Sequence, residues 1–173
     1  MITYNPAFDL YHCIYRMAHI VQKLSEGECF EIEKVRIWDF YLLFPSKLYE
    51  VSLKLSEKDL REARRNFIKL SKSPYEYCGD NRKLFEWIKP FQVSALNCLV
   101  SCGILSKDAY LNNQVCVSNY QALADFVEKA GDITQHEHNV LAFLSLLSRN
   151  MSLTGADGLK ARTRLLEYKY DAE

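Results

Sequence analysis

The sequence predicts a mainly α-helical protein with a small β-sheet, and three observations carry this prediction. Apolar residues recur every three or four positions over several long segments, as they do on the buried face of a helix. Capping residues, prolines and glycines stand at the ends of these segments. Two short runs rich in valine, isoleucine and cysteine lie between helical segments and have the composition of strands.

Composition predicts one domain spanning residues 1–173, which could consist of two small lobes sharing a core. Apolar residues make up 49% of the chain, enough for a sizeable core. The 22 basic and 22 acidic residues give a formal net charge of zero, which argues against a dedicated binder of polyanions but permits a local basic patch. Near-zero charge with many aromatic residues favours a subunit that has a permanent partner.

Residues 1–72 are predicted to form the N-terminal helices. Asn5 and Pro6 have the pattern of an N-cap followed by proline at the first helical position. The apolar positions that follow at helical spacing are Leu10, Ile14, Met17, Val21 and Leu24. Residues 31–44 fit a strand by alternation or a helix by length, and we favour a helix that ends before Pro45.

A third helix is predicted to begin near Ser56, and its outward side is basic. Between Lys54 and Lys72 there are seven basic residues and three acidic ones. The candidate nucleic-acid-binding residues form a stripe at helical spacing: Lys58, Arg61, Arg65, Lys69 and Lys72. This stripe could bind phosphates or an acidic partner. The alternative, which we favour, is the solvated face of an amphipathic helix.

Residues 84–131 have the order of elements of a winged-helix unit. A short amphipathic piece precedes an apolar helix that Pro90 is predicted to open and Gly103 to close as the C′ residue. Ile104–Leu105 and Val115–Val117 are predicted to be two short strands. A further helix follows, capped by Ser118 and ended by Gly131.

Residues 135–173 are predicted to form a C-terminal helix followed by a terminal strand. Thr134 and Glu137 match the capping box of the helix. After a turn at Gly155 and Gly158, apolar and charged residues alternate, and we expect this strand to pair with Val115–Val117. The candidate partner-binding residues of this segment are Gly158, Lys160, Arg162, Arg164, Tyr168 and Tyr170.

No catalytic, cofactor-binding or metal-binding motif is recognisable. Gly155–Lys160 resembles a phosphate loop only superficially, because its spacing is too short and it follows a helix. The pairs His12 with His19 and His136 with His138 lack an evident further metal ligand, so we interpret them as ordinary helix residues. No signal peptide or membrane-spanning run is evident, which predicts a cytoplasmic protein.

The cysteines are predicted to be reduced thiols buried in the core, as expected in the cytoplasm. None of them forms a Cys-x-x-Cys pair. They are Cys13, Cys29, Cys78, Cys98, Cys102 and Cys116.

Four segments, in the same order along the chain, carry a resemblance to a known family: Met1–His12, Val35–Pro45, Phe91–Leu96 and Gly158–Thr163. They resemble the middle-component family of bacterial ABC three-component conflict systems, of which Lamassu-type antiphage defence is the best-known setting. The resemblance implies a small subunit without catalytic residues, built partly on a winged-helix plan. It also implies two partners, an SMC-like coiled-coil ATPase and an effector that is often a nuclease.

Two hypotheses about function follow. The first is a non-catalytic adaptor that bridges the ATPase and the effector and meets DNA through the complex. The alternative is a winged-helix DNA-binding regulatory protein that uses the basic stripe directly.

Overall fold

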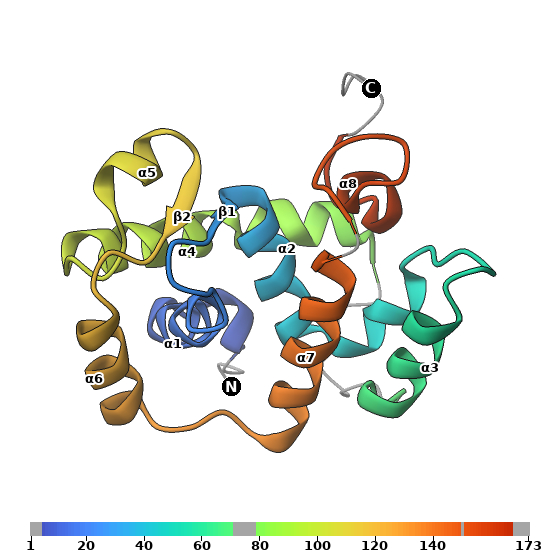
Figure 1. The fold of residues 1–173 in the computed structure, drawn as a ribbon, viewed down its shortest axis with the longest axis horizontal. Helices are drawn as coiled ribbons and strands as arrows, with labels where there is room; N and C mark the ends of the chain where they lie inside the picture. Colours follow the sequence, from blue (N-terminus) through green and yellow to red (C-terminus); the bar gives the residue numbers. More distant parts are fainter. Residues whose placement is uncertain (1–4, 71–78, 150, 168–173) are drawn as a thin grey trace. The chain divides into compact units, whose positions relative to one another are not determined.

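A computed structural model describes residues 5–70, 79–149 and 151–167 (Figure 1). It confirms a mostly helical chain with a small antiparallel sheet of two strands. The elements follow in the order η1 Pro6–Phe8, α1 Leu10–Val21, β1 Cys29–Glu31, α2 Ile32–Leu43, η2 Pro45–Glu50, α3 Lys58–Phe67, α4 Asn81–Ser101, α5 Lys107–Leu111, β2 Gln114–Cys116, α6 Tyr120–Ala130, α7 Gln135–Arg149 and α8 Leu159–Thr163.

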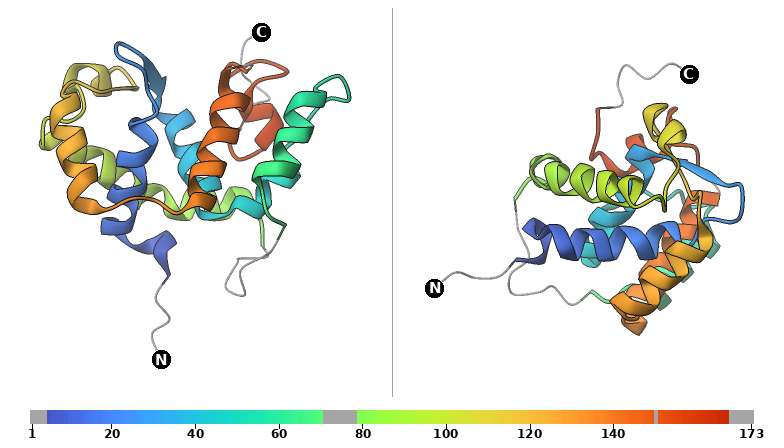
Figure 2. Two further views of the ribbon diagram at one scale, coloured as in Figure 1. Left: turned by 60° about the horizontal axis from the view of Figure 1, so that its bottom comes forward. Right: turned by 90° about the vertical axis from the view of Figure 1, so that its left-hand side faces the viewer.

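The chain divides into two compact units, each made of two separate stretches of sequence. Unit 1 comprises Met1–Asp39 and Trp87–Ile133, and unit 2 comprises Phe40–Glu86 and Thr134–Glu173. Within unit 1, α1 packs against α6. Within unit 2, α3 lies alongside α7, as the left view of Figure 2 shows.

The first helical segment begins later than predicted. Asn5 caps only the short 3-10 helix η1, through a hydrogen bond that its side chain accepts from the N–H of Ala7. Asp9 is the N-cap of α1, since its carboxylate accepts a hydrogen bond from the N–H of His12 at 2.7 Å. The helix favoured for residues 31–44 is confirmed as α2, and Pro45 then opens η2.

The prediction that Pro90 opens a helix is wrong, because Pro90 lies inside α4. The helix begins at Asn81, nine residues before Pro90. The preceding Asp80 accepts from the N–H of Arg82 through its carboxylate at 2.9 Å and from the N–H of Leu84 through its carbonyl at 3.1 Å. Pro90 is exposed and removes one helical hydrogen bond, while α4 keeps a buried face that includes Ile88, Leu96 and Leu99. Gly103 is the C′ residue as predicted, with φ +73° and a Schellman pair of hydrogen bonds.

The sheet pairs segments that sequence reasoning left apart. β2 lies antiparallel to β1, with Cys29 opposite Cys116 and Phe30 opposite Val115. Residues 104–105 contribute only an isolated bridge, from Leu105 to Val117. β1 was missed because a strand of three residues carries almost no periodic signal.

The helices α6 and α7 begin close to the predicted positions, but the N-cap of α6 is one residue later than predicted. α6 is capped by Asn119 rather than Ser118, whose hydroxyl donates instead to the carbonyls of Gly103 and Ile104. The capping box of α7 is confirmed: the N–H of Thr134 donates to Glu137 at 2.7 Å, and the N–H of Glu137 donates to Oγ1 of Thr134 at 3.3 Å.

Candidate functional site

The segment 151–167 of unit 2 folds back on itself around two glycines. Gly155 has φ +93°, a conformation that favours glycine. A Cβ atom on Gly158 would lie 2.3 Å from the carbonyl oxygen of Thr154, so only glycine fits there. The N–H groups of Leu159 and Lys160 donate to the carbonyls of Ser152 and Leu153, which closes the loop onto the start of α8.

Arg162 joins this loop to the segment before α3. Its Nη1 lies 2.8 Å from a carboxylate oxygen of Glu57 and also donates to the carbonyl of Ser52 at 3.2 Å. Its Nε donates to the carbonyl of Asp157 at 2.8 Å. With 7% of the residue exposed, Arg162 is a buried cation whose hydrogen bonds are largely satisfied within unit 2.

A second ion pair lies at the rim of the same cluster, between Lys54 and Asp157. A small hollow is lined by Ser52, Leu53, Lys54, Ala156, Asp157, Ala161 and Arg162. The hydrogen bond from Arg162 lowers the pKa of Glu57, and the hydrogen bond from Lys54 lowers the pKa of Asp157. Two cations face two carboxylates, so the cluster is close to neutral.

The predicted partner-binding residues occupy different environments. Gly158 and Arg162 are buried, Lys160 is half-buried, and Arg164 is exposed with φ +56°. Lys160 and Arg162 lie on α8, and the predicted strand is not seen at Leu166 or Glu167. Tyr168 and Tyr170 lie outside the described residues.

Of the predicted basic stripe, Lys58, Arg61 and Arg65 lie on α3, and Lys69 follows the end of that helix at Phe67. Lys58, Arg65 and Lys69 are exposed and Arg61 is half-buried, while Lys72 lies outside the described residues. Two further basic residues of this region make internal contacts. Arg64 donates from Nη1 to the carbonyls of Leu48 and Val51 at 3.2 and 3.0 Å, and Lys54 pairs with Asp157. The local excess of positive charge facing solvent is therefore smaller than the sequence indicates.

A buried polar network in unit 1 escaped sequence analysis. Asp39 accepts from Nε of Arg16 at 2.7 Å and from Nε2 of Gln92 at 2.9 Å. Gln92 in turn accepts from Nε of Arg36 at 2.9 Å. All four residues are buried, and the signal was a lone carboxylate within the apolar run of α2.

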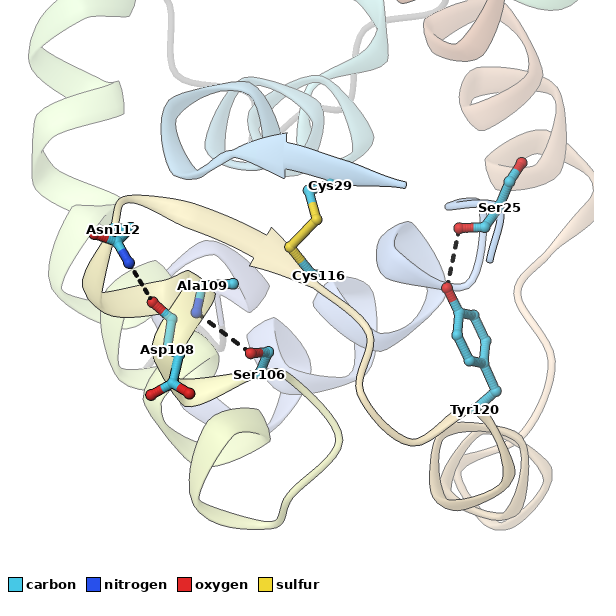
Figure 3. The surroundings of a disulfide bond; sticks show 8 residues. All are labelled: Ser25, Cys29, Ser106, Asp108, Ala109, Asn112, Cys116 and Tyr120. Atoms are coloured by element: carbon cyan, nitrogen blue, oxygen red, sulfur yellow. Dashed lines mark hydrogen bonds between the residues drawn. A yellow bond between two sulfur atoms is a disulfide. The ribbon is translucent and has the colours of Figure 1, made fainter. Parts of the chain in front are cut away.

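The prediction of reduced, buried cysteines is wrong for several of them. Cys29 and Cys116 form a disulfide, shown in Figure 3, and Cys29 is exposed. Cys102 is also exposed, whereas Cys13 is buried. Burial, followed by the nearby Asp39 carboxylate, raises the pKa of the Cys13 thiol. Cys78 lies outside the described residues.

The two histidines of unit 1, His12 and His19, contact other residues rather than each other. His19 is buried, with Nε2 3.0 Å from the carbonyl of Gly131 at the end of α6. Across residues 5–70, 79–149 and 151–167, no cluster of three or more His, Cys, Asp or Glu side chains is placed to hold a metal ion. In the same part of the chain, every helix is too short or too polar to cross a bilayer.

Together, the fold and these clusters define a small helical protein whose prominent buried charges bind its own backbone and carboxylates. Residues 2–171 match the family model described as ABC-three component (ABC-3C) system Middle Component 5. The chain therefore belongs to this family and is a conflict-system subunit that works with protein partners. No curated protein and no solved structure matches it.

Proposed function

We propose that this chain is a non-catalytic adaptor in an antiphage defence complex of the cytoplasm. In this proposal it bridges an SMC-like coiled-coil ATPase and an effector, which is a nuclease in many such systems. The observation that carries the proposal is the family match over residues 2–171, because a middle component is by definition one part of a larger assembly.

Exposed aromatic side chains of unit 1 support a protein-binding role. Phe8 packs edge-on against Phe91, with ring centroids 5.9 Å apart. Tyr11 and Trp87 are 83% and 53% exposed. Tyrosine and tryptophan are enriched at protein interfaces, where their large rings bury much area at little cost in conformational entropy.

The test is co-purification of the full chain with the ATPase and effector encoded beside it. We expect a stable complex that survives size-exclusion chromatography. A monodisperse monomer with no affinity for either neighbour would contradict the proposal.

A charge-reversal variant then tests the C-terminal segment. Deleting residues 158–173 would remove the buried residues Leu159, Arg162 and Leu165, so loss of assembly would only report misfolding. The double variant Lys160→Glu/Arg164→Glu is sharper, since neither residue is buried. We expect it to weaken assembly while the melting temperature stays near that of the wild type. Lys129→Glu, on an exposed position of α6, is the matched control.

The alternative function, a DNA-binding regulator, rests on the exposed part of the basic stripe. It predicts salt-sensitive binding of duplex DNA by the isolated chain. It also predicts that Arg61→Glu/Arg65→Glu/Lys69→Glu abolishes this binding. Fluorescence anisotropy with labelled duplex at two salt concentrations separates the two functions, because the adaptor does not need DNA contacts of its own.

A further inference from the structure

The disulfide of unit 1 joins the two strands of the sheet directly across from each other. Cys29 and Cys116 are register partners in the antiparallel pair, and their Cα atoms are 4.5 Å apart. Such a spacing is typical of the pairs that exchange no backbone hydrogen bonds, where side chains are closest. The bond therefore links residues that the sheet itself already places side by side.

The sheet is too small to be stable without support. It has two strands of three residues each, and isolated two-stranded sheets are marginal in water. Beneath the disulfide, Val115 and Phe30 are buried, and Phe30 packs against Trp38 with ring centroids 5.3 Å apart. A covalent link across the strands thus holds a small apolar layer onto the core of unit 1.

Hydrogen bonds also join the two cysteine-bearing segments. The hydroxyl of Tyr120 donates to the carbonyl of Ser25 at 3.0 Å, a few residues from each cysteine (Figure 3). The N–H of Ile32 donates to the carbonyl of Asn113 at 3.1 Å, which joins positions three residues from each cysteine. We expect these contacts to hold the two thiols near each other when the bond is open.

The two cysteines of the pair differ in exposure. Cys29 is exposed, whereas Cys116 is half-buried. Of the remaining described cysteines, Cys13 is buried, Cys98 is half-buried and Cys102 is exposed at the end of α4. We therefore expect a small molecule to reach Cys29 before Cys116. Cys102 is the control, because it is an exposed cysteine that is not part of the disulfide.

We propose that Cys29 and Cys116 form a reversible redox-modification site that exchanges with low-molecular-weight disulfides and thiols. In the oxidising direction, the Cys29 thiolate attacks a small disulfide, forms a mixed disulfide and releases one small thiolate. The Cys116 thiolate then attacks the sulfur of Cys29 and expels the second. Two electrons pass to the small disulfide, and the two protons lost by the cysteines protonate the released thiolates.

The consequence of oxidation is a stiffer sheet and a more stable unit 1. The bond closes a loop with a sequence separation of 87. Closing a loop of this length removes much of the conformational entropy of the unfolded chain, which stabilises the folded state. We expect the oxidised protein to melt about 5–10 °C above the reduced protein. The inference does not depend on the adaptor function.

The experiment equilibrates the full chain in buffers running from reduced to oxidised glutathione. Samples are quenched in acid, free thiols are alkylated, and unreduced peptides are quantified by mass spectrometry. We expect the Cys29–Cys116 peptide to rise from near absence to near completion, and to fall again when the buffer is reversed. A pair that is always linked or never linked overturns the proposal, as does one that ends as mixed disulfides with glutathione.

Three variants test whether the difference in melting temperature between oxidising and reducing buffers comes from the Cys29–Cys116 bond. Cys29→Ser and Cys116→Ser are expected to lose the difference between oxidising and reducing buffers, whereas Cys102→Ser keeps it. A shift that disappears in Cys102→Ser contradicts the assignment. If either serine variant of the pair does not fold, the peptide measurement on the wild-type chain decides the outcome alone.

Discussion

Arg16 and Asp39 form a fully buried ion pair in unit 1, with Nε of Arg16 2.7 Å from Oδ1 of Asp39. A second contact joins Nη2 of Arg16 to Oδ2 at 3.4 Å, and Nη1 donates to the carbonyl of Pro6 at 3.1 Å. The pair ties α1 to α2, and Gln92 adds α4 through its own bond to Asp39. Residues of three helices, all three residues within unit 1, thus meet at one carboxylate.

Removing this carboxylate is expected to destabilise the protein strongly. Asp39→Ala leaves the Arg16 guanidinium buried without its counter-charge, which costs about 3–5 kcal/mol of unfolding free energy. Urea denaturation followed by circular dichroism measures the loss. Asp132→Ala, at an exposed position of unit 1, should change stability by less than about 0.5 kcal/mol. Equal losses of unfolding free energy in the two variants would show that the Arg16–Asp39 ion pair does not stabilise the protein.

The ion pair between Glu57 and Arg162 is expected to make stability depend on pH in the acid range. Arg162 lowers the pKa of Glu57 below its ordinary value of 4.5 in the folded state. The unfolded chain therefore binds a proton more readily at this group. The stabilisation is complete well above pH 4.5 and is lost as the pH falls through the lowered folded-state pKa.

Glu57→Gln isolates this effect. The variant should be less stable than the wild type at neutral pH, and the difference should shrink as the pH is lowered towards the folded-state pKa of Glu57. Chemical denaturation at several pH values between neutral and acid provides the measurement. Glu62→Gln, on the exposed side of α3, is the control. A gap between wild type and Glu57→Gln that is constant over this range argues against the ion pair as its source.

Gly158 is expected to tolerate no side chain. The added Cβ of Gly158→Ala meets backbone atoms of Leu153 and Thr154 that cannot move independently, so we expect a loss of about 3 kcal/mol. Gly155→Ala has open space and bears only the strain of its positive φ, about 1–2 kcal/mol. Thermal denaturation of both variants tests the order. If Gly155→Ala melts at a lower temperature than Gly158→Ala, the close approach of Gly158 to the backbone of Thr154 does not limit stability.

Two adjacent arginines of α3 are expected to behave differently. Arg64 donates to two carbonyls and lies over the ring of Tyr49, 5.2 Å from its centroid. We expect Arg64→Ala to cost about 1.5–3 kcal/mol, since two backbone acceptors lose a charged donor. Arg65→Ala should cost less than about 0.5 kcal/mol because Arg65 is exposed. Urea denaturation distinguishes them, and similar losses would contradict the structural role of Arg64.

Sequence patterns predicted the long helices and several of their ends. α2, the capping box at Thr134 and the glycine end of α4 depend on contacts within a few residues, which a sequence displays directly. β1 depends on a partner 87 residues away, and α4 continues through the exposed Pro90, although proline inside a helix usually ends it. Long-range packing of this kind leaves little trace in a single sequence.

The candidate site shows the same division. Glycine and basic residues drew attention to the segment around Gly158, and its role in partner binding stays a prediction. Their roles could not be predicted, because Arg162 is buried by residues 52–57, which are distant in sequence. The basic stripe likewise included exposed residues but could not show that its neighbour Arg64 contacts the backbone.

The division of each unit into two stretches has a consequence for synthesis on the ribosome. α1 and β1 emerge first, but α6 and β2, against which they pack, are made only after the first stretch of unit 2. At typical translation speeds this delay is about 5–20 s, during which the apolar side of α1 lacks its final neighbours. Nascent chains of this protein are therefore expected to engage chaperones such as those that bind exposed apolar segments, until residue Ile133 has left the exit tunnel.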